Sequence, residues 1–439
     1  MTDSDARPFA GLEVVEFGQF IAVPFCAQLL AEGGAHVVKV ESLEGDPVRN
    51  LAPLAPGETR HFISRNRGKH SLPLDLRHAG AGAVITRLLA RADVVLTNFR
   101  PGFAEELGLD YAALAPRHPR LIVGNVSAFG RRGPDAKLAG MDMVVQARSG
   151  LMSTLGRFNE EGVPTAGDAP VADYMCALIL SFGIAAALLR RERTGRGGEV
   201  DVALLMAAML LQNNSFVRVQ SADAAVHAAT LARLAELRAA GRPYAEQAAA
   251  MPTTRTPGMA GVYYRTYATR DAAVAVACVS PGLQRTFIKA IGLEDSAHAR
   301  PIRDRDALAR HYADLGRRAE AALAARTTAE WKAIFDAQGV PAAGVAFAIE
   351  LLDDPQPLAN GLFHDLAHPA LGPVRVLAPP LQMDRDGFRA APATPALGSE
   401  TEAILDWLGF GAEEVERLVA DGVTQCAKRA GNLGKNMAP

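Results

Sequence analysis

The sequence has few of the features that mark disulfide-rich or zinc-binding proteins. It contains only four cysteines in 439 residues, namely Cys26, Cys176, Cys278 and Cys426. Because these positions are far apart and form no CxxC pair, the pattern argues against a disulfide framework and against a zinc site. We therefore expect a reducing compartment and no metal cofactor.

Segments that could cross or enter a membrane are also scarce. No uncharged apolar run reaches the roughly 18 residues that a spanning helix needs. A secretion signal has a basic region followed by an apolar stretch. Residues 1–17, MTDSDARPFAGLEVVEF, do not have this pattern. We therefore expect a cytoplasmic protein with no membrane partner.

Neither sign of charge is in excess. The chain has 46 Lys and Arg residues against 48 Asp and Glu residues, and they are interspersed. A protein that binds nucleic acid usually carries a basic surface, so we expect no nucleic-acid partner and only local sites for anions. With 49% hydrophobic residues, the chain is long enough for a large core and more than one domain.

What the sequence does contain is a repeated alternation of short strands and helices. Residues 11–17 (GLEVVEF) indicate a strand, and residues 24–41 indicate a helix, a glycine stop and a second strand. Helix and strand follow each other again in residues 79–102 and 111–130. This order predicts an α/β fold with a mostly parallel, doubly wound sheet. No G-x-G-x-x-G motif follows the first strand, so we expect no nucleotide redox cofactor.

The middle of the chain has a different pattern. Residues 222–250 are rich in Ala, Arg and Glu and indicate a solvated helix. Residues 262–280 alternate like an antiparallel hairpin with a turn at Thr269 to Asp271. We therefore expect a large Rossmann-like domain that begins the chain, a linker helix with a smaller α+β domain, and a return segment that completes the large domain: 1–220, 221–335 and 336–439.

Two carboxylates lie at the start of an apolar segment, VPTAGDAPVADYMCALILSFG, residues 163–183. A charged group there is costly unless it is paired or used. From the residues alone, Asp168 in AGDAP is most simply a turn residue. Asp173 is either the N-cap of the helix that follows or a nucleophile or base, and the residues leave both interpretations open.

Several segments, in the same order from about residue 10 to residue 422, together resemble the family III coenzyme A (CoA) transferases, which include formyl-CoA transferase, carnitine CoA-transferase and the α-methylacyl-CoA racemases. They include GLEVVEFGQFIAVPF, NRGKHSLPLDLR, ADVVLTNFRPG, GMDMVVQARSGLM, ADYMCALILSFG, QGVPAAGV and APALGSETEAIL. The resemblance implies an interlocked homodimer, with an acyl-CoA and a small organic acid as substrates.

By resemblance, Asp173 occupies the position of the catalytic carboxylate. An ionised carboxylate can attack a CoA thioester, which gives a mixed anhydride and releases the CoA thiolate. With an ordinary Asp pKa of about 3.9 the nucleophile would need no separate base at neutral pH. We also expect backbone N–H groups at the helix start to stabilise the developing oxyanion.

Two alternatives share this resemblance: an acyl-CoA racemase or epimerase, and a CoA-binding protein without catalysis. The racemases carry a His base where Met141 stands here, and a thioether cannot accept an α-proton. Asp142, the next residue, matches an acidic position of the family. It is either a second polar group near the anhydride or a helix cap.

The resemblance also implies a set of CoA-binding positions, of which Arg77 and Arg100 are the best candidates for phosphate or ribose contacts. The full set is Phe20, Ile21, Ala22, Lys39, Ser42, Leu74, Arg77, Asn98, Phe99, Arg100, Leu138 and Met141. For a glycine-rich lid over the substrate, the sequence offers TPGMAG, with Gly258 and Gly261.

Four positions depart from the family's pattern. Val23 stands where a Gly is usual, and Ala177 replaces a Gly near the catalytic Asp. Ser42 replaces an Arg of some members, and Glu106 replaces a commonly basic residue. These changes concern how CoA and the acyl group are held and leave the nucleophile intact.

Overall fold

The computed structural model describes residues 6–252, 256–384 and 387–427. The chain divides into two compact units. Unit 1 contains the residues up to Val219, the short piece Pro243–Ala245 and the chain from Ala359 onward. Unit 2 contains Gln220–Arg242 and Glu246–Leu358.

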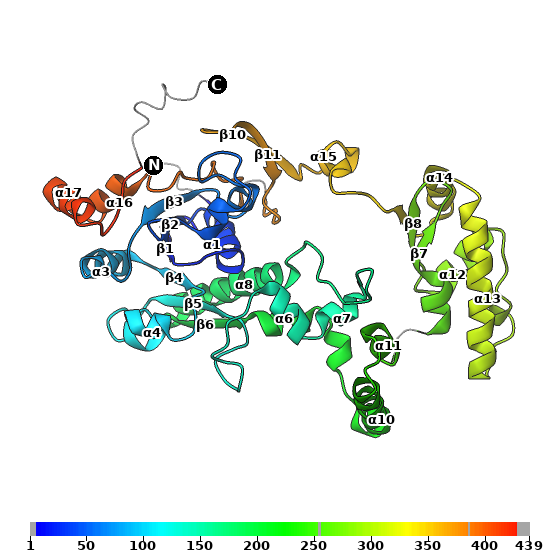
Figure 1. Cartoon of the computed structure of the whole chain (residues 1–439). Coiled ribbons are helices and arrows are strands. Elements are labelled where there is room, and N and C mark those ends of the chain that lie inside the picture. The colour runs from blue at the N-terminus through cyan, green and yellow to red at the C-terminus, as the bar shows by residue number, and fades with distance from the viewer. Residues whose placement is uncertain (1–5, 253–255, 385–386, 428–439) are drawn as a thin grey trace, which may run out of the picture. The chain divides into compact units, whose positions relative to one another are not determined.

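A six-stranded parallel sheet forms the centre of unit 1, in the order β3-β2-β1-β4-β5-β6 (Figure 1). Its strands are β1 (Glu13–Glu16), β2 (His36–Glu41), β3 (Lys69–Pro73), β4 (Val94–Thr97), β5 (Ile122–Ser127) and β6 (Gly198–Ala203). This confirms the predicted doubly wound sheet. The strand order reverses between β1 and β4, and in such folds a crevice for ligands opens at the carboxyl ends of the strands there.

Alternating residues of the central strands face two separate cores. Val14 of β1 belongs to one hydrophobic cluster and Val15 to the other. The first cluster includes residues of α1 (Ala22–Glu32), α8 (Val171–Thr194) and α9 (Leu204–Leu210), and the second includes residues of α3 (Ala81–Arg91) and α16 (Thr401–Trp407). The remaining helices of unit 1 are α2 (Arg60–Ile63), α4 (Phe103–Leu107), α5 (Tyr111–Leu114), α6 (Asp142–Arg148), α7 (Leu151–Leu155) and α17 (Ala412–Ala420).

Helix α8 is long and apolar enough, by length and composition, to cross a membrane. In unit 1 it packs against α1, α9, β5 and β6. Its residues Cys176, Leu180 and Ile184 are completely buried in the core. Core helices pass the same test of composition, so the packing explains part of the apolar sequence of α8, and a single such helix is weak evidence for a membrane.

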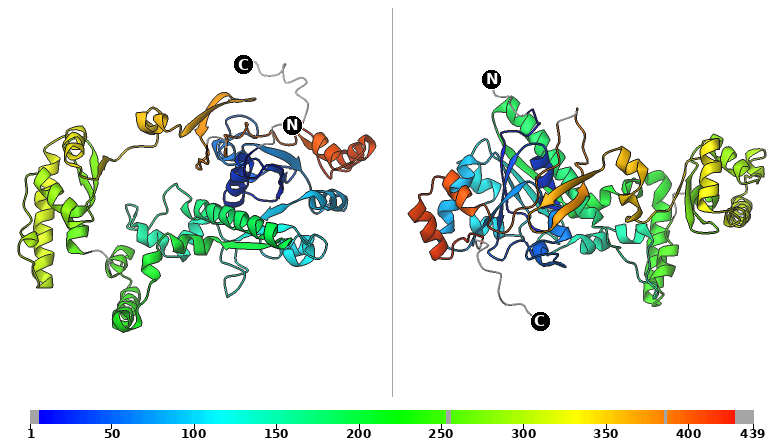
Figure 2. Two further views of the ribbon diagram at one scale, coloured as in Figure 1. Left: turned by 180° about the vertical axis from the view of Figure 1, so that it is seen from behind. Right: turned by 90° about the horizontal axis from the view of Figure 1, so that it is seen from above.

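Unit 2 is built on an antiparallel sheet of β7 (Tyr264–Ala268), β8 (Ala273–Ala277) and β9 (Ala342–Gly344). The hairpin predicted from the alternating pattern is confirmed, with its turn between β7 and β8. Helix α13 (Arg305–Ala324) runs along this unit in Figure 1 and in the left view of Figure 2, and it contacts β7. The helices of the unit are α10 (Gln220–Ala239), α11 (Tyr244–Ala249), α12 (Pro281–Ala290), α13 (Arg305–Ala324), α14 (Thr328–Gln338) and α15 (Pro355–Ala359). The first two residues of α11 and the last residue of α15 group with unit 1.

The return of the chain to unit 1 comes later than residue 336. Strand β9 pairs with β8, so the residues as far as Leu358 group with unit 2. The segment that follows forms the hairpin of β10 (Phe363–His368) and β11 (Gly372–Leu377) and then reaches β3. There the N–H of Gly398 donates to Ser71 Oγ at 3.0 Å, and Ser71 N donates to Glu400 at 3.1 Å.

Candidate active site

A cavity of about 520 Å³ opens at the carboxyl ends of β1 to β4, where the strand order reverses. Its lining comes from the end of β2 and from the four segments that follow these strands. The lining residues are Phe17, Gln19, Val40, Glu41, Ser42, Leu43, Glu44, Leu74, Asp75, Leu76, Arg77, Asn98, Phe99, Arg100 and Phe103. The structure thus brings together six of the residues predicted to bind CoA: Ser42, Leu74, Arg77, Asn98, Phe99 and Arg100.

Phe103 is a lining residue that the sequence analysis missed. Its ring lies 5.4 Å from the guanidinium carbon of Arg77 and 5.0 Å from that of Arg100. The aromatic residue two positions after TNFRP was the available signal. Two arginines beside aromatic rings suit a ligand that combines negative charge with a flat ring system, such as a nucleotide.

The loop between β1 and α1 is clamped to the end of β4. Asn98 accepts a hydrogen bond from Gln19 N at 3.0 Å and donates one to Gln19 O at 2.8 Å. Phe20 has a positive φ of 65°, which is unfavourable for a bulky residue, and its N–H contacts Asp46 Oδ1 at 3.4 Å. The other two predicted residues of this loop begin helix α1: Ile21 and Ala22.

The prediction that Lys39 contacts CoA needs correction. Its side chain is completely buried, and its ammonium bonds Glu16 at 2.9 Å, Asp46 at 2.9 Å and the carbonyl of Gly18 at 2.7 Å. Burial alone would lower its pKa, but the charges of Asp46 and Glu16 raise the pKa of Lys39 overall. Lys39 therefore cannot reach a ligand and instead holds the loop that borders the cavity.

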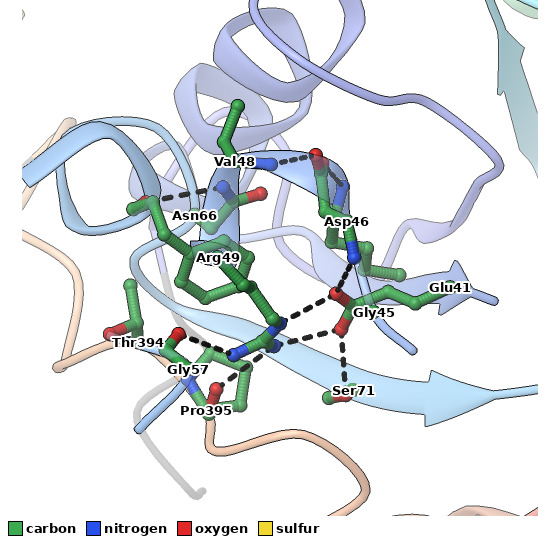
Figure 3. Close-up of polar contacts among 12 residues, drawn as sticks. Glu41, Gly45, Asp46, Val48, Arg49, Gly57, Asn66, Ser71, Thr394 and Pro395 are labelled. Carbon is green, nitrogen blue, oxygen red and sulfur yellow. Dashed lines mark hydrogen bonds and ion pairs between the residues drawn. The ribbon is translucent and has the colours of Figure 1, made fainter. Parts of the chain in front are cut away.

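Glu41, at the end of β2, is fixed by a bidentate ion pair with Arg49, whose Nε and Nη2 lie 2.7 and 2.8 Å from the two carboxylate oxygens (Figure 3). Ser71 Oγ and Asp46 N donate to the same carboxylate. Arg49 also donates to the carbonyl of Pro395 at 3.2 Å, so this network joins the cavity floor to the return segment. Burial alone would raise the pKa of Glu41, but Arg49 lowers it to about 2.

Asp173 lies in the first turn of α8 and is 9% exposed. Within the described ranges its carboxylate has no hydrogen bond or ion pair. Burial, followed by the negative charge of Asp142, raises the pKa of Asp173 to about 7, and the charge of Arg65 opposes the rise. This corrects the expectation of an ordinary pKa, because a carboxyl group with a pKa near 7 is partly protonated at neutral pH.

Asp142 caps helix α8 from outside that helix. Its Oδ1 accepts the N–H groups of Ala172 at 2.8 Å and Asp173 at 3.0 Å, and Gln146 donates to its Oδ2. Of the two interpretations that the sequence left open, this geometry favours the cap. It also shows that these two N–H groups are already used, so they are not available to the oxyanion as expected.

Other predicted residues lie away from the cavity. Leu138 and Met141 are 54% and 50% exposed in the segment that leads into α6, and neither is among the cavity's lining residues. Gly258 and Gly261 belong to unit 2, where a Cβ at either position would press on Tyr312. They are packing positions in that unit, which corrects the suggestion of a loop-like lid.

Three of the four departures from the family's pattern have a clear local setting. Val23 and Ala177 are fully buried in the core of unit 1, and Val23 fills the space that a side chain at Gly18 would need. Glu106 lies 3.0 Å from Arg100 and therefore partly neutralises a cation of the cavity.

Comparisons with known proteins agree with this arrangement. The model of CoA-transferase family III matches residues 9–401. A probable fatty acyl-CoA transferase of Mycobacterium tuberculosis is 31% identical over 364 residues, which are 82% of this chain and 88% of the relative. Cinnamoyl-CoA:phenyllactate CoA-transferase of Clostridium sporogenes is 27% identical over 95% of this chain and 98% of the relative.

Two solved structures share the fold. The crystal structure of Rv3272 from M. tuberculosis has a TM-score of 0.73 and 28% identity, and the match covers 91% of this chain and 100% of that one. A CaiB/BaiF family protein from Brucella suis has a TM-score of 0.69 and 27% identity over 92% and 99% of the two chains. The sequence match over residues 9–401 and the shared fold show that the chain belongs to CoA-transferase family III, for which CoA is a substrate.

Proposed function

We propose that this enzyme moves CoA from an acyl-CoA donor to a carboxylic acid acceptor through covalent intermediates on Asp173. The observation that carries the proposal is a buried carboxylate that, in the described part of the chain, has no cation or hydrogen-bond donor on its oxygens. Its pKa of about 7 provides ionised carboxylate at neutral and mildly basic pH. A desolvated, unpaired carboxylate is a stronger nucleophile than a paired one.

The proposed reaction uses only carboxylates, carbonyl groups and the CoA sulfur. An oxygen of Asp173 attacks the thioester carbonyl, the C–S bond breaks, and CoA leaves as a thiolate. The thiolate attacks the Asp173 carbonyl of the mixed anhydride, and the donor acid leaves as a carboxylate. The acceptor carboxylate then attacks the aspartyl-CoA thioester, and the released thiolate attacks the acceptor's acyl carbon. Asp173 is regenerated without transfer of a proton.

The cavity at the carboxyl ends of β1 to β4 is the proposed site for the nucleotide end of CoA. Arg77 and Arg100 supply positive charge there, and Phe103 supplies an aromatic face. The β1–α1 loop borders this cavity and leads into α1, which packs on α8. We therefore place the pantetheine arm along residues 18–22.

We also propose that the enzyme is a homodimer located in the cytoplasm, and the family resemblance implies that the two chains interlock. Unit 1 alone leaves an apolar stripe on α8, where Leu178, Phe182 and Leu189 are 47%, 77% and 61% exposed. Exposed apolar patches of this kind mark interaction surfaces. Light scattering at several concentrations tests the dimer, and a Phe182→Glu variant should weaken it.

The mechanism is tested by intact-protein mass spectrometry with donors and acids drawn from the relatives' names. Suitable pairs are cinnamoyl-CoA with phenyllactate, succinyl-CoA with glutarate, and acetyl-CoA with oxalate. We expect CoA exchange with at least one pair and an adduct on Asp173 that hydroxylamine releases.

The matched controls are Asp173→Asn, which should lose at least about 10³-fold in kcat, and Asp168→Asn, which should retain activity. If wild type and Asp173→Asn move CoA equally slowly, the proposed nucleophile is wrong. Deuterium incorporation at the α-carbon of the acyl group, without CoA exchange, would instead indicate a racemase.

A further inference from the structure

Arg65 is a buried cation that differs from the other buried arginines of unit 1. It lies in the turn after α2 and is 6% exposed. Within the described ranges it forms no ion pair with a carboxylate. By contrast, three buried arginines each lie 2.7 to 2.9 Å from a carboxylate oxygen: Arg49 from Glu41, Arg67 from Glu32 and Arg191 from Asp93. A buried cation without a counter-ion is unfavourable unless a bound group supplies one.

The guanidinium of Arg65 is held against Tyr174, the residue that follows the proposed nucleophile. Its Nε donates to Tyr174 Oη at 3.2 Å, and its central carbon lies 5.7 Å from the centre of the Tyr174 ring. Tyr174 directly follows Asp173 on α8, and its own ring packs edge to face on Phe25 with centroids 5.0 Å apart. The charge of Arg65 acts on Asp173 and opposes the rise of its pKa.

The two terminal nitrogens of Arg65 have no hydrogen-bond partner among the described residues. Neither nitrogen is completely buried. A planar guanidinium with both terminal NH₂ groups unpaired is the shape that binds a carboxylate through two parallel hydrogen bonds.

An acid that approaches Asp173 meets a repulsive field. In the acceptor step Asp173 is the uncharged aspartyl-CoA thioester, so the opposing charge is that of Asp142, which after burial is the second cause of the raised pKa of free Asp173. A second carboxylate needs a cation to occupy the same place. Arg65 is the cation whose charge acts on Asp173.

We propose that Arg65 binds the reacting carboxylate of the acid substrate beside Asp173, and that Tyr174 is a positioning residue that orients the guanidinium. The inference rests on the proposed function and adds the group that selects for an acid. In the acceptor step one carboxylate oxygen stays on Arg65 while the other forms the new C–O bond to the Asp173 carbonyl. The C–S bond breaks, and the electron pair leaves with the CoA thiolate. The same contact holds the donor acid as it leaves.

The test measures two Michaelis constants in each variant, one for the acid and one for the acyl-CoA, with the best pair among those named above. We expect Arg65→Ala to raise KM for the acid ten- to a hundredfold and KM for the acyl-CoA less than threefold. Arg65→Lys keeps the charge but loses the planar fork, so its increase should be smaller. Tyr174→Phe should raise KM for the acid several-fold.

Arg60 provides the matched control, since it is an exposed arginine on α2 in the same segment. Arg60→Ala should leave both constants unchanged. Millimolar guanidinium ion should lower KM for the acid in Arg65→Ala and leave KM unchanged in Arg60→Ala. A merely structural role for Arg65 would not respond to the added ion.

An unchanged KM for the acid in Arg65→Ala, or an equal rise in both constants, overturns the proposal. So does an effect confined to dicarboxylic acids, because Arg65 would then bind the distant carboxylate. If Arg65→Ala does not fold by thermal melting, Tyr174→Phe decides the matter by the same criteria. The Asp173 adduct is measured in parallel: its absence in wild type refutes the proposed function, whereas its presence with an unchanged acid KM refutes only the role of Arg65.

Discussion

Glu41 and Asp173 are two buried carboxylates of the same unit with opposite properties. They are 4% and 9% exposed, so burial alone does not distinguish them. Glu41 accepts hydrogen bonds from Arg49, Ser71 and Asp46 N, and its pKa falls to about 2. Burial, followed by the negative charge of Asp142, raises the pKa of Asp173 to about 7.

On the proposed mechanism, one fold uses the same functional group for stability at Glu41 and for chemistry at Asp173. Paired carboxylates such as Glu41 stabilise the fold, because the partner compensates the free-energy cost of burying the charge. An unpaired carboxylate stays destabilised by burial in the folded state. This destabilisation makes the carboxylate more reactive as a nucleophile. Three predictions test whether partners rather than burial account for the contrast, and a fourth tests the effect of a partner on the arginines of the cavity.

The largest effect is expected when the pair at Glu41 is broken. Arg49→Gln removes the cation and leaves Glu41 buried without compensation, which should lower the free energy of unfolding by about 3–5 kcal/mol. Urea denaturation at pH 7.5 measures this. Arg60→Gln, at an exposed position, is the control and should change stability by less than about 0.5 kcal/mol. A loss below about 1 kcal/mol for Arg49→Gln would show that the Arg49–Glu41 ion pair does not stabilise the fold.

Asp173→Asn should have the opposite sign and stabilise the protein. The folded-state pKa of Asp173 is raised above its unfolded value, so the folded state binds more protons between about pH 4 and pH 7, and stability falls as pH rises through that window. Removing the charge should therefore add about 1–3 kcal/mol above pH 7 and almost nothing near pH 4. Denaturation curves at pH 4.5 and pH 8 check this, and an equal effect at both would contradict the raised pKa.

The pH dependence of the rate comes next in size. Because the proposed mechanism requires Asp173 as the carboxylate, kcat/KM should fall about tenfold per pH unit below a midpoint near 7. Asp142→Asn keeps an oxygen for the N–H groups of α8 but removes the negative charge. It should therefore move the midpoint to lower pH by up to about one unit. A midpoint that does not move would mean that Asp142 acts only as a cap.

The smallest effect concerns the arginines of the cavity. Arg100 is partly neutralised by Glu106, whereas Arg77 has no ion pair in the part of the chain that the structure describes. Arg77→Gln should raise KM for acyl-CoA about tenfold, and Arg100→Gln only about threefold, consistent with the modest worth of exposed ion pairs. Glu106→Gln should lower KM slightly. Each effect should shrink at high salt, and equal effects for both arginines would contradict this ranking.

The parts of the fold that follow from local patterns were predictable. Alternating strands and helices predicted the parallel sheet, and period-two alternation predicted the hairpin of β7 and β8. The residue at which the chain leaves unit 2 was harder to predict, because β9 joins the sheet of unit 2 by pairing with β8, which is far away in sequence. The resemblance in the segments after the strands also named six of the cavity's lining residues, since the carboxyl ends of parallel strands converge.

Residues whose role depends on distant partners were not predictable. Lys39 matches a CoA-binding position in sequence, yet three buried partners occupy its ammonium. Gly258 and Gly261 were candidates for a lid, yet they pack on Tyr312. No sequence pattern identifies Arg65 as a candidate, because its contact with Tyr174 depends on the tertiary structure.

By itself, the sequence determined the class of fold, the resemblance to a CoA-transferase family and the identity of Asp173 as the candidate nucleophile. These depend on periodicity and on motif order, which the linear chain contains. The tertiary structure alone decided the charge state of that nucleophile and the group beside it. A pKa depends on burial and on charges within several ångströms, and for Asp173 those charges come from Asp142 and Arg65, 31 and 108 positions earlier in the chain.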